Sequence, residues 1–119
     1  MKQILLVEDD MTLGQGIVLA LRGPDTQTTL CRTLGEARAR VKNGSIDLII
    51  LDINLPDGSG LDLLYELREA GSSMSVIMLT ANDMEMDVVN ALESGADDYI
   101  LISRPNYTYS TKICKNKLG

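Results

Sequence analysis

Residues 48–52 read Leu-Ile-Ile-Leu-Asp, four aliphatic side chains in a row that end in a carboxylate. Residues 4–7 (Ile-Leu-Leu-Val) and 76–79 (Val-Ile-Met-Leu) have the same unbroken apolar character. A run that is apolar at every position suits a strand buried on both faces, as in a parallel sheet covered by helices. Weaker strand patterns at residues 26–30 and 99–102 bring the expected number of strands to five.

Helical patterns separate these runs. Apolar residues recur at helical spacing in residues 13–21, 34–41, 61–67 and 88–92. Thr33 and Glu36 form a capping-box pattern that opens the second helix, and Asn43-Gly44 ends it. Strict alternation of strand and helix predicts an α/β sandwich with right-handed crossovers around a parallel sheet. Residues 103–119 lack a clear apolar stripe, so we expect the last helix to be absent or irregular.

Composition excludes several classes of protein. The chain has 119 residues, enough for one domain, and 45% of them are hydrophobic, as in ordinary globular proteins. There is no histidine, which excludes imidazole catalysis and imidazole metal ligands. We see no secretory signal peptide and no apolar run long enough for a membrane span, so we expect a cytoplasmic protein without membrane contact. Cys31 and Cys114 match no metal-ligand or disulfide spacing, which agrees with reduced thiols.

Charge is unevenly distributed along the chain. The net charge of −6 combines −10 in residues 1–103 with +4 in residues 104–119. Because phosphate contacts need a basic surface, this acidic body predicts no direct nucleic-acid binding.

Acidic side chains follow two of the predicted strands. Glu8 and Asp9 come directly after the first strand, and Asp52 ends the third, while Thr80 follows the fourth. The carboxyl ends of parallel strands share one edge, where ligands bind in such folds. Clustered carboxylates repel one another unless a cation or proton compensates, and oxygen ligands favour Mg²⁺. Each residue alone would be read as a helix cap or turn, but their joint placement predicts a magnesium site with Asp52 as a potential nucleophile.

These segments resemble the receiver domain of two-component response regulators. The resemblance runs from Lys2 to about Ile100, over four-fifths of the chain, and is closest to receivers of winged-helix (OmpR/PhoB-like) transcription regulators. The segments that carry it are residues 4–10 (ILLVEDD), 51–61 (LDINLPDGSGL), 78–81 (MLTA) and 95–100 (GADDYI). The resemblance implies a flavodoxin-like (βα)5 three-layer sandwich. We accordingly expect a receiver domain in residues 1–102, followed by a divergent basic tail in residues 103–119, with no output domain.

The resemblance also implies roles for individual residues. Asp52 would accept a phosphoryl group from a sensor histidine kinase, in a signalling domain that is not an enzyme beyond some autophosphatase activity. Magnesium would be held by Glu8, Asp9, Asp52 and the main-chain carbonyl of Asn54. Thr80 would contact the phosphoryl oxygens and act as a switch together with Tyr99. Asn54 and Asn82 stand at positions where the family tunes the lifetime of the phosphoryl group.

The chain departs from the family after the fifth strand. The family has Lys-Pro there, whereas this chain has Ile102-Ser103, with Arg104-Pro105 two residues later. Arg is bulkier and planar and is not an equivalent of Lys, so we expect impaired switching. An absent last helix would leave the face of the sheet beside the first helix uncovered, and exposed apolar surface favours self-association through that face, such as a homodimer.

Two alternatives stay open at this point. A degenerate receiver could act as a phosphate-independent protein-interaction module, which Ile102 favours and the intact Asp52 disfavours. A Mg²⁺-dependent phosphohydrolase of similar architecture would need Asp-x-Asp, whereas this chain has Asp52-Ile53-Asn54.

Overall fold

The computed structural model describes residues 1–81, 92–93, 95–103 and 108–109. Its central sheet has the strand order β2-β1-β3-β6-β7-β8, and its first five strands are parallel. The long strands are β1 (Lys2–Val7), β2 (Thr26–Cys31), β3 (Leu48–Asp52), β6 (Ser75–Ala81) and β7 (Asp98–Ser103). Within the described residues, the helices with assigned bounds are α1 (Met11–Ala20), α2 (Leu34–Lys42) and α3 (Gly60–Glu69). The predicted five-stranded parallel α/β sandwich is therefore confirmed.

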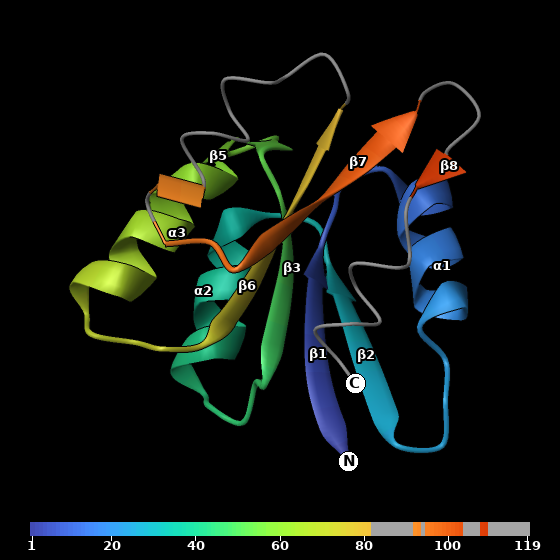
Figure 1. Ribbon diagram of the computed structural model, residues 1–119, viewed down its shortest axis with the longest axis horizontal. Helices are drawn as coiled ribbons and strands as arrows, with labels where there is room; N and C mark the ends of the chain where they lie inside the picture. Colours follow the sequence, from blue (N-terminus) through green and yellow to red (C-terminus); the bar gives the residue numbers. More distant parts are fainter. Residues whose placement is uncertain (82–91, 94, 104–107, 110–119) are drawn as a thin grey trace.

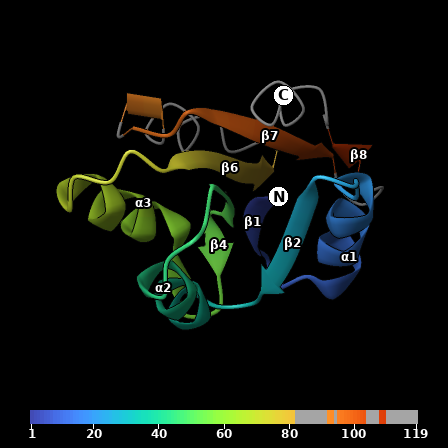
Figure 2. The same ribbon diagram turned by 90° about the horizontal axis from the view of Figure 1, so that it is seen from below.

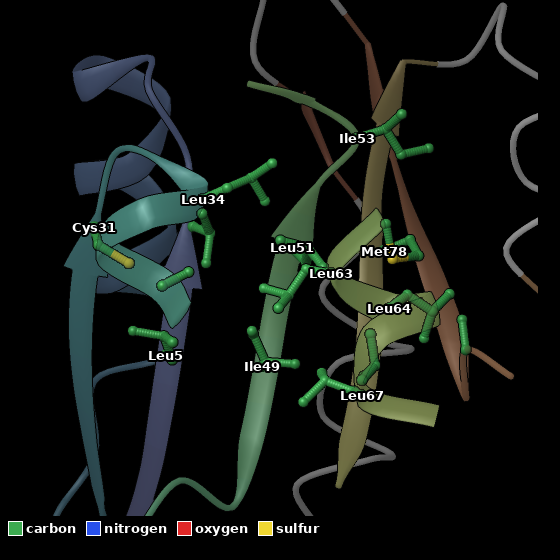
Figure 3. Packing of buried hydrophobic residues seen from close by; sticks show 14 residues of the cluster. Leu5, Cys31, Leu34, Ile49, Leu51, Ile53, Leu63, Leu64, Leu67 and Met78 are labelled. Atoms are coloured by element: carbon green, nitrogen blue, oxygen red, sulfur yellow. The ribbon is translucent and has the colours of Figure 1, made fainter. Parts of the chain in front are cut away.

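The helices cover the sheet from both sides. Figures 1 and 2 show α1 on one face, with α2 and α3 together on the other. Successive residues of a strand point to opposite faces of the sheet, so each aliphatic run contributes side chains to two hydrophobic cores, one on each face. Leu5, Ile49 and Leu51 pack with α2 and α3, whereas Ile4 and Ile50 pack with α1. Figure 3 shows the first of these cores, closed by leucines of α3. The four-residue apolar runs are explained by burial on both faces of the sheet.

Capping residues explain where the predicted helices begin and end. Asp10 caps α1 by accepting a hydrogen bond from the N–H of Leu13 at 3.1 Å. Thr33 caps α2 by accepting one from the N–H of Glu36 at 3.1 Å. The same helix ends at Lys42 with Asn43 as its C-cap, and Gly44 follows with φ of +84°, a conformation that favours glycine. The fourth expected helix, 88–92, lies outside the described residues except for Leu92.

Two short hairpins were not expected from the sequence. The strands β4 (Asn54–Leu55) and β5 (Gly58–Ser59) pair antiparallel, directly after Asp52. At the sheet edge, β8 (Thr108–Tyr109) pairs antiparallel with the end of β7, through Ile102–Tyr109 and Ser103–Thr108. The sheet thus has one short antiparallel strand beyond the five predicted parallel ones. A two-residue strand is too short to show a periodic pattern, and its backbone pairing covers an edge that would otherwise be open.

The face of the sheet on the α1 side was expected to lie open. In the structure Ile50, Ile77 and Leu79 are fully buried and Ile100 is 2% exposed. The described part of this face therefore has no exposed aliphatic surface at these four positions. The tail that was expected to be irregular, beyond Ser103, lies outside the described residues except for β8. Among the helices that the structure describes, none is long and apolar enough to cross a membrane.

Candidate functional site

Three carboxylates meet at the carboxyl edge of the sheet. Glu8 and Asp9 follow β1, and Asp52 is the last residue of its neighbour β3. One oxygen from each residue lies within 4.8 Å of the others. Glu8 is fully buried and Asp52 is 8% exposed, whereas Asp9 faces solvent. The sequence prediction that these residues converge is confirmed by this geometry.

Glu8 is held rigidly at the base of the cluster. Its N–H donates to the carbonyl of Cys31 at 2.9 Å, which continues the pairing of β1 with β2. Its Oε1 accepts the N–H of Asp10 at 2.9 Å. Its Oε2 is buried without a hydrogen-bond partner among the residues that the structure describes. Burial, and behind it the adjacent Asp52 carboxyl, raise the pKa of Glu8 to about 9.

These features fit a hard divalent cation. Three clustered carboxylates cannot all be ionised without a compensating positive charge. A buried carboxylate oxygen without a partner is a ligand atom suited to that role, and oxygen-only donors are what Mg²⁺ takes. Glu8, Asp9 and Asp52 would supply its protein carboxylates.

The backbone after Asp52 is closely packed. Asn54 donates its N–H to Asp52 Oδ1 at 3.3 Å, and Gly60 donates its N–H to the carbonyl of Ile53 at 2.7 Å. A Cβ at Gly60 would overlap the carbonyl oxygen of Asp52 and lie 3.1 Å from Leu51 Cγ. The start of α3 therefore rests directly on the backbone of Asp52, and only glycine permits this approach.

Of the remaining predicted site residues, some lie in described strands and others lie outside the described residues. The backbone of Thr80 lies in β6, one residue beyond Leu79, which is in register with Asp52 on β3. Tyr99 lies in β7, is half-buried and packs against the core formed with α2 and α3. Asn54 is exposed in β4. Asn82 and Arg104 lie outside the described residues.

Sequence reasoning gave no role to Asp57, in the turn between β4 and β5, or to Gly60, the first residue of α3. Both were quoted only within residues 51–61, one of the segments that carry the resemblance. The carboxylate of Asp57 accepts hydrogen bonds from the N–H groups of Leu34 and Gly35 at the start of α2, at 2.8 and 3.0 Å. The sequence signal for Gly60 is its place next to the predicted start of a helix. No local pattern connects Asp57 to residues more than twenty positions away.

Known protein families and curated proteins include sequences similar to this chain. Residues 4–103 match the model of the response regulator receiver domain. The chain is 46% identical over 99 residues to the response regulator protein PmrA of Pseudomonas aeruginosa, and 40% identical over 100 residues to the DNA-binding response regulator MtrA of Mycobacterium tuberculosis. These matches cover 82% and 84% of this chain but only 44% and 43% of the relatives. The chain thus spans less than half the length of these curated relatives.

Solved structures show the same fold. The receiver domain of Francisella response regulator 1452 superposes with a TM-score of 0.83 at 26% identity, covering 99% of this chain and 93% of that one. TrrA from Thermotoga maritima, solved in complex with Mg²⁺-BeF, superposes with a TM-score of 0.80 at 27% identity, covering 99% and 96%. A receiver is a signalling domain rather than an ordinary enzyme, so the phosphohydrolase alternative is set aside. This chain belongs to the response regulator receiver domain family of two-component signalling systems.

Proposed function

We propose that this chain accepts a phosphoryl group on Asp52 from a sensor histidine kinase, with Mg²⁺ held by Glu8, Asp9, Asp52 and the main-chain carbonyl of Asn54. The observation that carries the proposal is the cluster of three carboxylates, of which Asp52 and Glu8 are buried. The family match supports the same reading.

The chemistry follows from the positions of these groups. A carboxylate oxygen of Asp52 attacks the phosphorus atom, forming an acyl phosphate while the bond from phosphorus to the donor atom breaks. Glu8 and Asp9 would hold Mg²⁺, which when bound would supply positive charge for the phosphoryl oxygens. The hydrogen bonds of Glu8 with Asp10 and of Asp52 with the Asn54 N–H keep the two carboxylates in place at the sheet edge.

The proposed switch uses residues further along the sheet. Thr80 would contact the phosphoryl oxygens, and the aromatic ring of Tyr99 would turn inward behind Thr80. Asn54 and Asn82 would set the lifetime of the phosphoryl group. Ile102 stands where the family has lysine, so we expect phosphorylation with poor switching. We expect that Arg104 does not replace this lysine. Arg104→Ala should therefore leave the lifetime of the phosphoryl group unchanged, and a changed lifetime would show that Arg104 takes the role of the lysine.

The experiment is the intact mass of the protein after incubation with a small-molecule acyl phosphate, with and without Mg²⁺. We expect a Mg²⁺-dependent phosphoryl adduct that Asp52→Asn abolishes. Asp62→Asn is a matched control, since Asp62 is an exposed aspartate in the first turn of α3. No adduct on a folded protein that binds Mg²⁺ would contradict the proposal.

The second candidate is a phosphate-independent interaction module, favoured by Ile102 at the lysine position. It predicts a partner interaction that is unchanged by Asp52→Asn, whereas a phosphorylation-dependent interaction would be lost.

The names of the curated relatives suggest the cellular role of this activity. We propose a cytoplasmic domain that serves transcription regulation, because one relative is named a DNA-binding response regulator. The acidic charge of residues 1–103 argues against direct nucleic-acid binding. Self-association stays a prediction, and light scattering at high concentration tests it: a dimer mass supports it and a monomer mass contradicts it.

A further inference from the structure

Asp57 links two elements that are distant in the sequence. It lies in the turn of the β4–β5 hairpin, and its carboxylate accepts the N–H groups of Leu34 and Gly35 in the first turn of α2. The first N–H groups of a helix have no partner within the helix and need one from outside. Thr33 supplies one from the helix's own N-cap, for Glu36. The hairpin after β3 supplies two more.

An apolar contact joins the same two elements. Gly58 has φ of +146°, which favours glycine, and a Cβ there would lie 3.1 Å from Leu34 Cδ1. Leu34 is 1% exposed and belongs to the core beneath α2. The hairpin backbone is therefore seated on the start of α2 by both hydrogen bonds and packing, and Figure 2 shows β4 beside α2.

Both anchored elements lead back to the acidic site. The hairpin begins at Asn54, whose N–H is bound by Asp52 and which pairs with Ser59 across the hairpin. On the other side, α2 follows β2, and the last residue of β2, Cys31, accepts the N–H of Glu8. Contacts and short chain segments thus connect Glu8 through α2 and the hairpin to Asp52, and the hydrogen bonds of the Asp57 carboxylate, beside the packing of Gly58 on Leu34, join α2 to the hairpin.

We infer that Asp57 is a positioning residue for the cation site: by tying the β4–β5 hairpin to α2, it holds the main chain of Asn54 relative to Glu8 and Asp9. This inference rests on the proposed function, in which the Asn54 carbonyl is a Mg²⁺ ligand. Mg²⁺ tolerates little departure from octahedral geometry, so a ligand on a short exposed hairpin needs an external anchor. Groups that orient metal ligands typically change metal affinity 10- to 100-fold when removed.

The test measures Mg²⁺ affinity of the unphosphorylated protein by titration of backbone amide NMR shifts. Asp57→Ala removes both hydrogen bonds to α2 and should weaken Mg²⁺ binding about tenfold, the lower end of that range. Asp57→Asn keeps one acceptor oxygen, so its affinity should fall between wild type and Asp57→Ala.

Two controls separate positioning from other effects. Thr33→Ala removes a different cap of the same helix without touching the hairpin, and Asp25→Ala removes an exposed carboxylate in the loop before β2, at the other end of that strand. Both should bind Mg²⁺ within about twofold of wild type. The amide spectra report in the same experiment whether each variant is folded, and Asp57→Asn provides the comparison if Asp57→Ala is not.

Three results would overturn the inference. Wild-type affinity in both Asp57 variants would show that the link has no effect on the site. An equal loss in Thr33→Ala would assign the effect to the general stability of α2. Absence of Mg²⁺ binding in folded wild type would instead remove the proposed metal site itself, and the inference with it.

Discussion

Replacing Gly60 by alanine should distort the phosphoacceptor backbone. The new Cβ would overlap the carbonyl oxygen of Asp52, which is main chain and cannot rotate away like a side chain. Overpacking of this kind costs about 1–3 kcal/mol, and an obstacle made of backbone puts the expected loss near the upper value. At about 4 °C per kcal/mol for a domain of this size, the melting temperature should fall by roughly 8–12 °C.

Gly16→Ala is the matched control. Gly16 lies within α1, and a Cβ there would meet nothing within 4 Å. The same substitution should therefore stabilise the protein by about 0.5–1 kcal/mol, through the higher helix propensity of alanine.

The assay is urea and thermal unfolding followed by circular dichroism, with Mg²⁺ titration of both variants. Gly60→Ala should lose stability and Mg²⁺ affinity together, because the same shift moves Asp52. Equal stability of the two alanine variants would refute the close approach of α3 to Asp52. Full Mg²⁺ affinity in a destabilised Gly60→Ala would refute its link to the site.

Three other predictions concern ionisable groups outside the metal site. The N–H groups of Leu34 and Gly35 lower the pKa of Asp57, so its contribution to stability is present above the ordinary value of about 3.9 and disappears as pH falls through its lower folded value. The stability difference between wild type and Asp57→Asn should shrink on acidification, and a difference constant down to pH 2 in urea unfolding would contradict this. Arg38 and Glu66 form a bidentate ion pair between α2 and α3, with side chains 45% and 49% exposed. Arg38→Ala should lower the free energy of unfolding by about 0.5 kcal/mol, and by less in high salt. A loss above about 2 kcal/mol would contradict the weak contribution expected of an exposed ion pair. Burial raises the pKa of the Cys31 thiol to about 11, so peptide mapping should find it unmodified by iodoacetamide at pH 7.5 and modified in urea; rapid modification of the native protein would contradict its burial.

The strands and the acidic cluster could be predicted because they follow from local patterns. Aliphatic runs without a polar residue required burial on both faces, and parallel strands bring their carboxyl ends to one edge. Glu8, Asp9 and Asp52 therefore had to meet once the strand order was known.

The long-range contacts could not be predicted in this way. The bonds of Asp57 join residues 23 and 22 positions apart, and their existence depends on how the β4–β5 hairpin sits on α2. Burial of Glu8, and with it the rise in its pKa, also depends on packing from several elements. The exposed apolar face was expected from a missing helix, yet Ile50 and Ile77 are buried.

The central claim is that Asp52 carries the phosphoryl group, and its most direct test is the location of that group. After incubation with an acyl phosphate and Mg²⁺, borohydride reduces an aspartyl phosphate to homoserine, which peptide mass spectrometry can map. The account predicts homoserine at position 52 and its loss when Mg²⁺ is withheld. Homoserine at another carboxylate, or none in a folded protein that binds Mg²⁺, would contradict it.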